Sequence, residues 1–166
     1  MGESTVPTIA VRQVAAADAP ALLALIDGLA DYEDLPRPDA AARARLTRDL
    51  AVEPPLFRAL LAEREGRPVG YAVYFFAYST FLARPTLYLE DVFVQPSERG
   101  NGAGLALMRA VARAAVERDC GRLEWSVLIW NRPAMAFYER LGAAPLLEWQ
   151  PWRLLPQQFA RLAADG

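Results

Sequence analysis

The segment from residue 86 to residue 121 constrains the fold more than any other part of the sequence. Thr86–Val94 carries apolar residues on both faces, which predicts a central strand covered from both sides of a sheet. A glycine-rich turn follows, and apolar spacing predicts a helix from about Gly102 to Asp119, ended by Gly121. The residues of this helix expected to face inward are Leu105, Met108, Val111, Ala112, Ala115 and Val116. This order favours an α/β fold.

Local patterns also predict the elements on either side of this segment. Before it we expect a strand at Thr8–Val14, a helix from the N-cap Asp18 to about Tyr32, a weaker helix at Asp39–Ala51, and a hairpin of strands at Phe57–Arg64 and Val69–Tyr78. After it we expect a strand at Arg122–Ile129, a helix from Asn131 to Leu141, and strands at Leu146–Trp149 and Trp152–Leu155. The order predicts one α/β domain over residues 1–166, with a central mixed sheet flanked by about four helices and residues 1–7 as a flexible N-terminus.

The composition argues against several classes of function. A net charge of −2 and a pI near 5.3 give no basic face for nucleic acid, and no window approaches 18 uncharged apolar residues. We therefore expect a soluble cytoplasmic protein that binds neither nucleic acid nor membrane. With no histidine and the single cysteine Cys120, the chain lacks the usual zinc ligands and a histidine-based triad, so no metal is expected. Its chemistry must use carboxylates, tyrosines or backbone amides.

The glycine-rich turn is the sharpest signal of a binding site. It comprises Arg99, Gly100, Asn101, Gly102, Ala103 and Gly104, placed after a strand and at the start of a helix. Backbone amides in such a turn can point at an anion on the helix N-terminus, and glycines remove the Cβ atoms that would block close approach. The spacing fits neither the dinucleotide fingerprint nor a P-loop. The alternative is a tight strand-to-helix turn without a ligand.

Two adjacent carboxylates, Glu90 and Asp91, interrupt the apolar central strand. A carboxylate in such a strand must be paired, solvated from a cleft, or shifted upward in pKa. Each of these options suits a general base, and Glu90 is the candidate; the alternative is an ion pair with a nearby arginine. The two side chains should point to opposite sides of the strand unless a bulge intervenes.

Several motifs resemble a known family. Arg99–Gly104 matches the signature Gln/Arg-x-x-Gly-x-Gly/Ala of the GNAT superfamily of acyltransferases, and the order of elements is similar as well. The segments that resemble its spermidine/spermine branch, with the diamine and thialysine N-acetyltransferases, are Leu29–Glu33, Leu87–Val94, Trp130–Pro133 and Ala136–Gly142. The resemblance implies the GNAT fold, acetyl-CoA as co-substrate with its pyrophosphate on the turn, and a homodimer.

The resemblance also implies roles for individual residues. Glu90 would take the proton from the substrate ammonium, directly or through water, and Tyr138 would protonate the departing thiolate; the alternative for Tyr138 is packing beside Phe137. The residues expected to hold the coenzyme, besides those of the turn, are Phe93 and Val94 through backbone amides, Arg140, and Asn131, for which helix capping is an equal alternative. The residues expected to contact the acceptor are Tyr32, Glu33, Phe81, Asp91 and Trp152.

The expected reaction is transfer of acetyl from acetyl-CoA to a primary amine of a small molecule by direct attack in a ternary complex. Ser79, Phe81 and Gln150 stand where the polyamine enzymes of the family carry an acid, a tryptophan and a glutamate. This difference favours a shorter diamine or a lysine analogue over spermidine. The alternatives are a peptide acetyltransferase and a non-catalytic acyl-CoA-binding module. An apolar tail that includes Trp149 and Phe159 could form the dimer interface or belong to the core.

Overall fold

The structure is a computed structural model that describes residues 8–164. These residues form two compact units, 8–126 and 127–164. The N-terminus that we expect to be flexible, residues 1–7, lies outside the described residues, and a single domain over the whole chain stays a prediction. No helix in the described part of the chain is both long and apolar enough to cross a membrane.

The first unit is built on a five-stranded mixed sheet. Its strands are β1 (Ile9–Gln13), β2 (Arg58–Arg64), β3 (Arg67–Ser79), β4 (Arg84–Val94) and β5 (Arg122–Trp125), and they lie in that order across the sheet. The first four pair antiparallel, whereas β4 and β5 pair parallel through the helical crossover between them. The predicted α/β class with a mixed sheet is confirmed. The strand expected to be central, β4, is held between β3 and β5.

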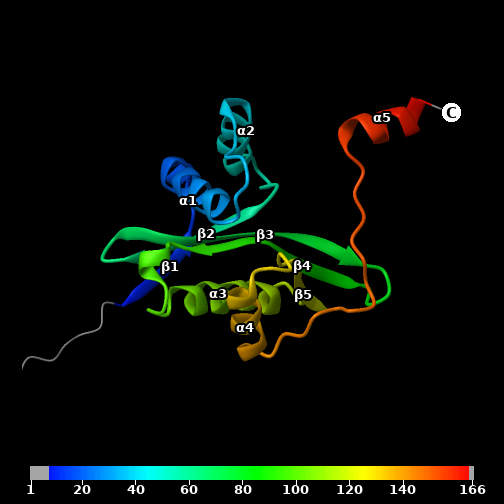
Figure 1. Ribbon diagram of the computed structural model, residues 1–166. Coiled ribbons are helices and arrows are strands. Elements are labelled where there is room, and N and C mark those ends of the chain that lie inside the picture. Colours follow the sequence, from blue (N-terminus) through cyan, green and yellow to red (C-terminus); the bar gives the residue numbers. More distant parts are fainter. Residues whose placement is uncertain (1–7, 165–166) are drawn as a thin grey trace, which may run out of the picture. The chain divides into compact units, whose positions relative to one another are not determined.

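Helices cover both faces of this sheet (Figure 1). α1 (Ala19–Tyr32) and α2 (Ala40–Leu50) lie on one face, and α3 (Ala103–Glu117) lies on the other. On the first face, Leu22 and Leu25 of α1 pack with the buried side chains Tyr71, Val73 and Phe93 of the sheet. Burial of side chains this large stabilises the fold by about 1.5–3 kcal/mol each, so this cluster fixes α1 over β3 and β4.

A close approach of β3 and β4 requires glycine at position 70. A Cβ atom there would lie 2.6 Å from the carbonyl oxygen of Phe93 and 3.1 Å from the Val94 side chain. We expect Gly70→Ala to lower the free energy of unfolding by about 1–3 kcal/mol, because the two strands must move apart. Urea denaturation would measure this loss. Ala77→Ser, on the exposed part of the same strand, should change stability by less than about 0.5 kcal/mol; equal losses would contradict the explanation.

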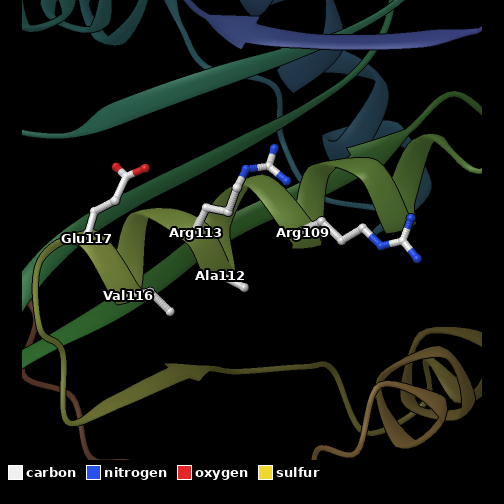
Figure 2. Close-up of a pocket in the computed structure, with 5 residues that line it drawn as sticks. All are labelled: Arg109, Ala112, Arg113, Val116 and Glu117. Carbon is white, nitrogen blue, oxygen red and sulfur yellow. The ribbon is translucent and has the colours of Figure 1, made fainter.

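α3 presents a different face to the sheet from the one expected. Its buried residues are Ala103, Leu107, Met108 and Val111, so the expectation is confirmed for Met108 and Val111, whereas Leu105 and Ala115 are half-buried. Ala112 and Val116 are exposed instead, and with Arg109, Arg113 and Glu117 they line a surface pocket on α3 (Figure 2). The expectation for Ala112 and Val116 was wrong because this alanine-rich helix carries apolar residues on more than one face. The sequence pattern does not show which of these faces packs against the sheet.

Asp18 occupies the position before α1, as expected, but its side chain does not cap that helix. Its carboxylate accepts hydrogen bonds from the Ala15 amide at 2.7 Å and from the Arg12 guanidinium at 2.7 and 2.9 Å. Arg12 and the Ala15 amide lower the pKa of Asp18 to about 2. Asp18 is the last residue of a 3₁₀ turn at Ala16–Asp18, and its carboxylate bonds back to the start of that turn instead of forward to the amides of α1. Asp18 therefore fixes the turn between β1 and α1.

The second unit contains two helices in its described residues, α4 (Arg132–Arg140) and α5 (Pro156–Ala164). The helix after Asn131 is confirmed, but the predicted strands at Leu146–Trp149 and Trp152–Leu155 are wrong: both segments are irregular, and β5 ends at Trp125 rather than Ile129. Apolar residues in short runs form a strand only where a neighbouring strand supplies ladder partners.

α5 was not expected from the sequence. Pro156 occupies its first turn, and the Gln158 side chain accepts a hydrogen bond from the Leu155 amide at 2.7 Å. Proline at a first helical position and glutamine two residues later are helix-start signals, and both were available in the sequence.

Candidate active site

β4 has a free edge beyond Leu89. Its parallel pairing with β5 covers only residues 86–89, opposite 122–125, although β4 continues to Val94. In the described chain no strand pairs with this edge from Glu90 onward. Backbone groups on that edge lack a strand partner and can pair with an extended ligand, except that the Val94 carbonyl already accepts a hydrogen bond from Arg99. The expected pantetheine contact at these two residues stays a prediction.

A β-bulge lies where the free edge begins. Tyr74 pairs with Leu89 and the next residue back, Val73, pairs with Asp91, so Glu90 has no partner on β3. A bulge of this kind bends the strand and changes the direction of its side chains. Because of this bulge, the side chains of Glu90 and Asp91 need not point to opposite faces of the sheet.

Asp91 lies on the face of the sheet that α1 covers. It is opposite Val73, which belongs to the cluster under α1, and it is half-buried. The Tyr71 hydroxyl donates a hydrogen bond to Asp91 Oδ2 at 3.3 Å. Burial first, and then the charge of Glu90, raise the pKa of Asp91 to about 6, although the hydrogen bond from Tyr71 opposes this rise. Asp91 is still mostly ionised at neutral pH.

Glu90 is solvated rather than buried. Glu90 is exposed, so this carboxylate is in contact with solvent. Asp91, not Glu90, is the carboxylate whose pKa is raised by burial. The alternative that Glu90 is paired with an arginine is not observed: within residues 8–164, no ion pair found in the structure involves Glu90 or Asp91.

The end of α1 supplies a third carboxylate. Glu33 follows the last residue of the helix, Tyr32, and its charge contributes to raising the pKa of Asp91. Burial raises the pKa of Glu33 itself. We call Glu33, Glu90 and Asp91 the carboxylate cluster. It concentrates negative charge beside the free edge of β4, an arrangement that attracts a cation.

The glycine-rich turn has the geometry of an anion site. Gly100 and Gly102 have φ of +79° and +87°, values that favour glycine, and a Cβ on either would meet nothing within 4 Å. Gly102 is the N-cap of α3, and no side chain caps the helix there. The first amides of α3 are thus left to an outside acceptor, as for a phosphate on a helix N-terminus. Asn101 closes the turn through a long contact of 3.5 Å to the Glu98 carbonyl, and Ala103 is buried.

Side chains next to the turn attach it to the rest of the unit. Glu98 forms an ion pair with Arg64 at 2.9 Å, at the end of β2. Arg99 donates from Nε to the Val94 carbonyl at 3.1 Å, and its guanidinium lies 4.3 Å from the centre of the Tyr32 ring. Arg99 thus joins the turn to β4 and to the end of α1. Its predicted contact with the coenzyme phosphates stays a prediction.

Phe81 lies away from the carboxylate cluster along β4. It occupies the β3–β4 turn, is 98% exposed and lies ten residues before Asp91; from Arg84 to Asp91 the chain follows β4, which advances about 3.3 Å per residue. Ser79, at the base of this turn, is buried, and its hydroxyl accepts hydrogen bonds from the Leu82 amide at 3.3 Å and Arg122 at 3.1 Å. Ser79 therefore stabilises the turn, and an acceptor contact by Phe81 stays a prediction.

The second unit carries the remaining predicted residues. The Asn131 side chain accepts a hydrogen bond from the Ala134 amide at 3.3 Å, so the capping alternative is confirmed. Tyr138 is on α4 with its ring centre 5.5 Å from that of Phe137, and Arg140 is in the last turn. Trp152 lies in the irregular segment before α5 and is 90% exposed. The catalytic and binding roles of these residues stay predictions.

Sequence reasoning missed Tyr71. A tyrosine in the apolar run Val69–Tyr78 was interpreted only as part of a strand. The available signal was that a fully buried tyrosine hydroxyl needs a hydrogen-bond partner, and that a carboxylate on the adjacent strand can supply one.

Comparisons with known proteins agree with this geometry. The profile of the acetyltransferase (GNAT) family matches residues 22–143. The chain is 37% identical over 152 residues to the thialysine N-epsilon-acetyltransferase of Bos taurus, an alignment that covers 87% of this chain and 89% of that protein. It is 39% identical over 108 residues to the L-ornithine N5-acetyltransferase of Arabidopsis thaliana, covering 64% of this chain and 47% of that protein. A solved integron cassette protein from the mobile metagenome of V. cholerae has a TM-score of 0.77 at 26% identity, covering 93% of this chain and 97% of that one. The chain belongs to the GNAT family of acetyltransferases, in the branch that includes the thialysine N-acetyltransferases.

Proposed function

We propose that this acetyltransferase transfers acetyl from acetyl-CoA to the side-chain primary amine of a lysine-like amino acid or of a short diamine. The observation that carries the proposal is the carboxylate cluster beside the free edge of β4, the strand to which Arg99 attaches the glycine turn. The edge suits the extended arm of the coenzyme, the turn suits its pyrophosphate, and the cluster suits a cationic amine. Thialysine and ornithine, which relatives of this chain acetylate according to their names, each carry such a side-chain amine.

The reaction requires a neutral amine. An ammonium ion drawn to the cluster has no lone pair for attack, so one carboxylate must accept its proton, directly or through water. We assign this step to Glu90, because it is exposed and can exchange the proton with solvent. Asp91 and Glu33 would hold the cation in place. The resemblance to the family supports the same assignment.

The remaining steps need no covalent enzyme intermediate. The amine nitrogen attacks the thioester carbonyl carbon, the C–S bond breaks, and coenzyme A leaves as a thiolate that takes up a proton. We assign the donation of that proton to Tyr138. Backbone amides of the β4 edge would stabilise the negative charge that develops on the carbonyl oxygen. This mechanism uses only carboxylate, phenol and amide groups, as the composition requires.

The distribution of acidic groups favours a short acceptor. Ser79 is engaged in its own turn, and Phe81 is apolar, so the β3–β4 turn lacks the acidic group that would bind the distant amine of a polyamine. Glu90 and Asp91 lie instead toward the other end of β4, and Glu33 follows α1. We therefore propose that the acceptor binds through a positive charge at this cluster and makes no second charged contact at the β3–β4 turn.

A comparison of acceptors tests the proposal. Release of coenzyme A from acetyl-CoA would be followed with a thiol reagent for thialysine, lysine, ornithine, short diamines, spermidine, an aminoglycoside and a lysine peptide. We expect kcat/KM to be highest for the amino acids or short diamines, and at least about 10-fold lower for spermidine, a difference of 1.4 kcal/mol in transition-state binding. Preference for the peptide or for spermidine would contradict the proposal.

We also propose that the protein is a cytoplasmic homodimer. Support comes from the large apolar side chains exposed in the second unit, among them Trp149 at 76% and Leu147 at 87%, because exposed apolar patches mark interaction surfaces. Sedimentation equilibrium of the full chain should give twice the monomer mass. The monomer mass at micromolar concentration would contradict the dimer.

A further inference from the structure

The buried hydroxyl of Tyr71 is a polar group that the proposed reaction does not use. Tyr71 is fully buried in the cluster under α1, among Leu22, Leu25 and Phe93. Loss of water at a hydroxyl is costly unless a hydrogen bond replaces it. Asp91 provides that bond, with 3.3 Å between the hydroxyl and Oδ2. The contact therefore couples the core of the first unit to one carboxylate of the cluster.

The strand register explains why these two groups meet. Tyr71 pairs with Phe93 and Val73 pairs with Asp91, so Tyr71 and Asp91 are diagonal neighbours on one face of the sheet. Diagonal neighbours are within reach when one side chain is a long aromatic. Without the bulge at Glu90, the side chain at position 91 would turn to the other face. The bulge and the tyrosine thus act together on Asp91.

The hydroxyl is the donor in this contact. Burial and the charge of Asp91 raise the pKa of Tyr71 well above its ordinary value, so the phenol keeps its proton at any pH at which the enzyme works. The other groups that act on Asp91 are Glu90 on the same strand and Glu33 after α1, and both repel its negative charge. Tyr71 is the group that stabilises the ionised form against this repulsion.

We propose that Tyr71 is a positioning residue of the acceptor site: its buried hydroxyl holds the Asp91 carboxylate at the bulge, directed toward the ammonium group of the acceptor. The inference rests on the proposed function for the identity of that acceptor. Tyr71 itself does not touch substrate; it acts through Asp91.

Tyr71→Phe tests the inference because it removes only the hydroxyl. Without that donor the pKa of Asp91 should rise, so the acid limb of the pH profile of kcat/KM for the amine should move upward by about half to one pH unit. The KM for the amine at neutral pH should rise by about 5-fold, and the dissociation constant of coenzyme A should not change. The same change should have little effect when added to Asp91→Asn, because the two residues act as one unit.

Tyr74→Phe is the matched control. Tyr74 is equally buried on the same strand, but it lies three residues away and therefore on the opposite face. Its hydroxyl can be removed without changing Asp91, so neither the acid limb nor the KM should move. Circular dichroism would show that both variants fold.

A direct titration separates this inference from the proposed function. The carboxyl carbon of Asp91, assigned by its absence in Asp91→Asn, would be followed by NMR against pH in the wild type, Tyr71→Phe and Tyr74→Phe. A higher midpoint in Tyr71→Phe alone, with a raised KM for the amine, is the expected result. An unchanged midpoint, or a raised midpoint with an unchanged KM, would overturn the inference.

A wild-type protein that acetylates no amine would refute the proposed function, and the titration would still decide whether Tyr71 holds Asp91.

Discussion

Glu90→Gln should lower kcat/KM for amine acetylation by roughly 10²-fold or more, because glutamine cannot accept the proton of the ammonium group. The loss should be smallest at high pH, where a larger fraction of the amine is already neutral. The affinity for coenzyme A should stay the same, since Glu90 is separate from the glycine turn. Steady-state kinetics from pH 6 to pH 10, with calorimetry for coenzyme A, would measure both quantities.

Two further variants test whether Glu90, and not a neighbouring carboxylate, is the base. Asp91→Asn should raise the KM for the amine more than it lowers kcat, because Asp91 is assigned to binding rather than proton transfer. Glu124→Gln changes a glutamate on the neighbouring strand β5, where it pairs with Arg122 at 3.1 Å, and should leave kcat unchanged. If Asp91→Asn abolished turnover and Glu90→Gln did not, the base would be Asp91 and the assignment of Glu90 would be wrong.

Gly102→Val should weaken coenzyme A binding by roughly 10²-fold, equivalent to about 2.7 kcal/mol. Gly102 has φ of +87° at the N-cap of α3, a conformation that a β-branched residue adopts only under strain. The added side chain would also occupy the open space in front of the first amides of α3, where we place the pyrophosphate. Titration calorimetry with coenzyme A would measure the change.

Gly66→Val is the control for backbone strain alone. Gly66 also has a positive φ, +74°, with open space around its Cβ position, but it lies in the β2–β3 turn. We expect this variant to lose thermal stability to a similar extent while its affinity for coenzyme A is unchanged. A comparable loss of affinity in both variants would mean that the effect of Gly102→Val comes from general destabilisation and not from the anion site.

The sequence was sufficient to predict the elements of the first unit because their signals are local. β4 and α3 are fixed by an apolar run and by glycines that only one turn conformation accommodates, and their bounds agree with the prediction to within two residues. Helix α4 is similar, since Asn131 caps it within one turn of chain. The fold class followed from the order of these elements.

What could not be predicted depends on contacts distant in sequence. The bulge at Glu90 is defined by the register of β4 against β3. The pKa of Asp91 is raised by burial and by the charges of Glu90 and Glu33, and is lowered by the hydrogen bond from Tyr71. The buried face of α3 could not be predicted because alanines occur on several faces of the helix. The tail after Leu141 was interpreted from its apolar residues alone, which do not show whether a neighbouring strand is present.

The measurement that tests the central claim most directly is identification of the acetylated product. The full chain would be incubated with acetyl-CoA labelled in the acetyl group and with thialysine, and the product would be located by NMR and mass spectrometry. The account predicts label on the side-chain amine of thialysine, with one coenzyme A released for each acetyl transferred, and loss of this product in Glu90→Gln. Binding of acetyl-CoA without transfer to any amine, or label on the protein in place of the amine, would contradict it.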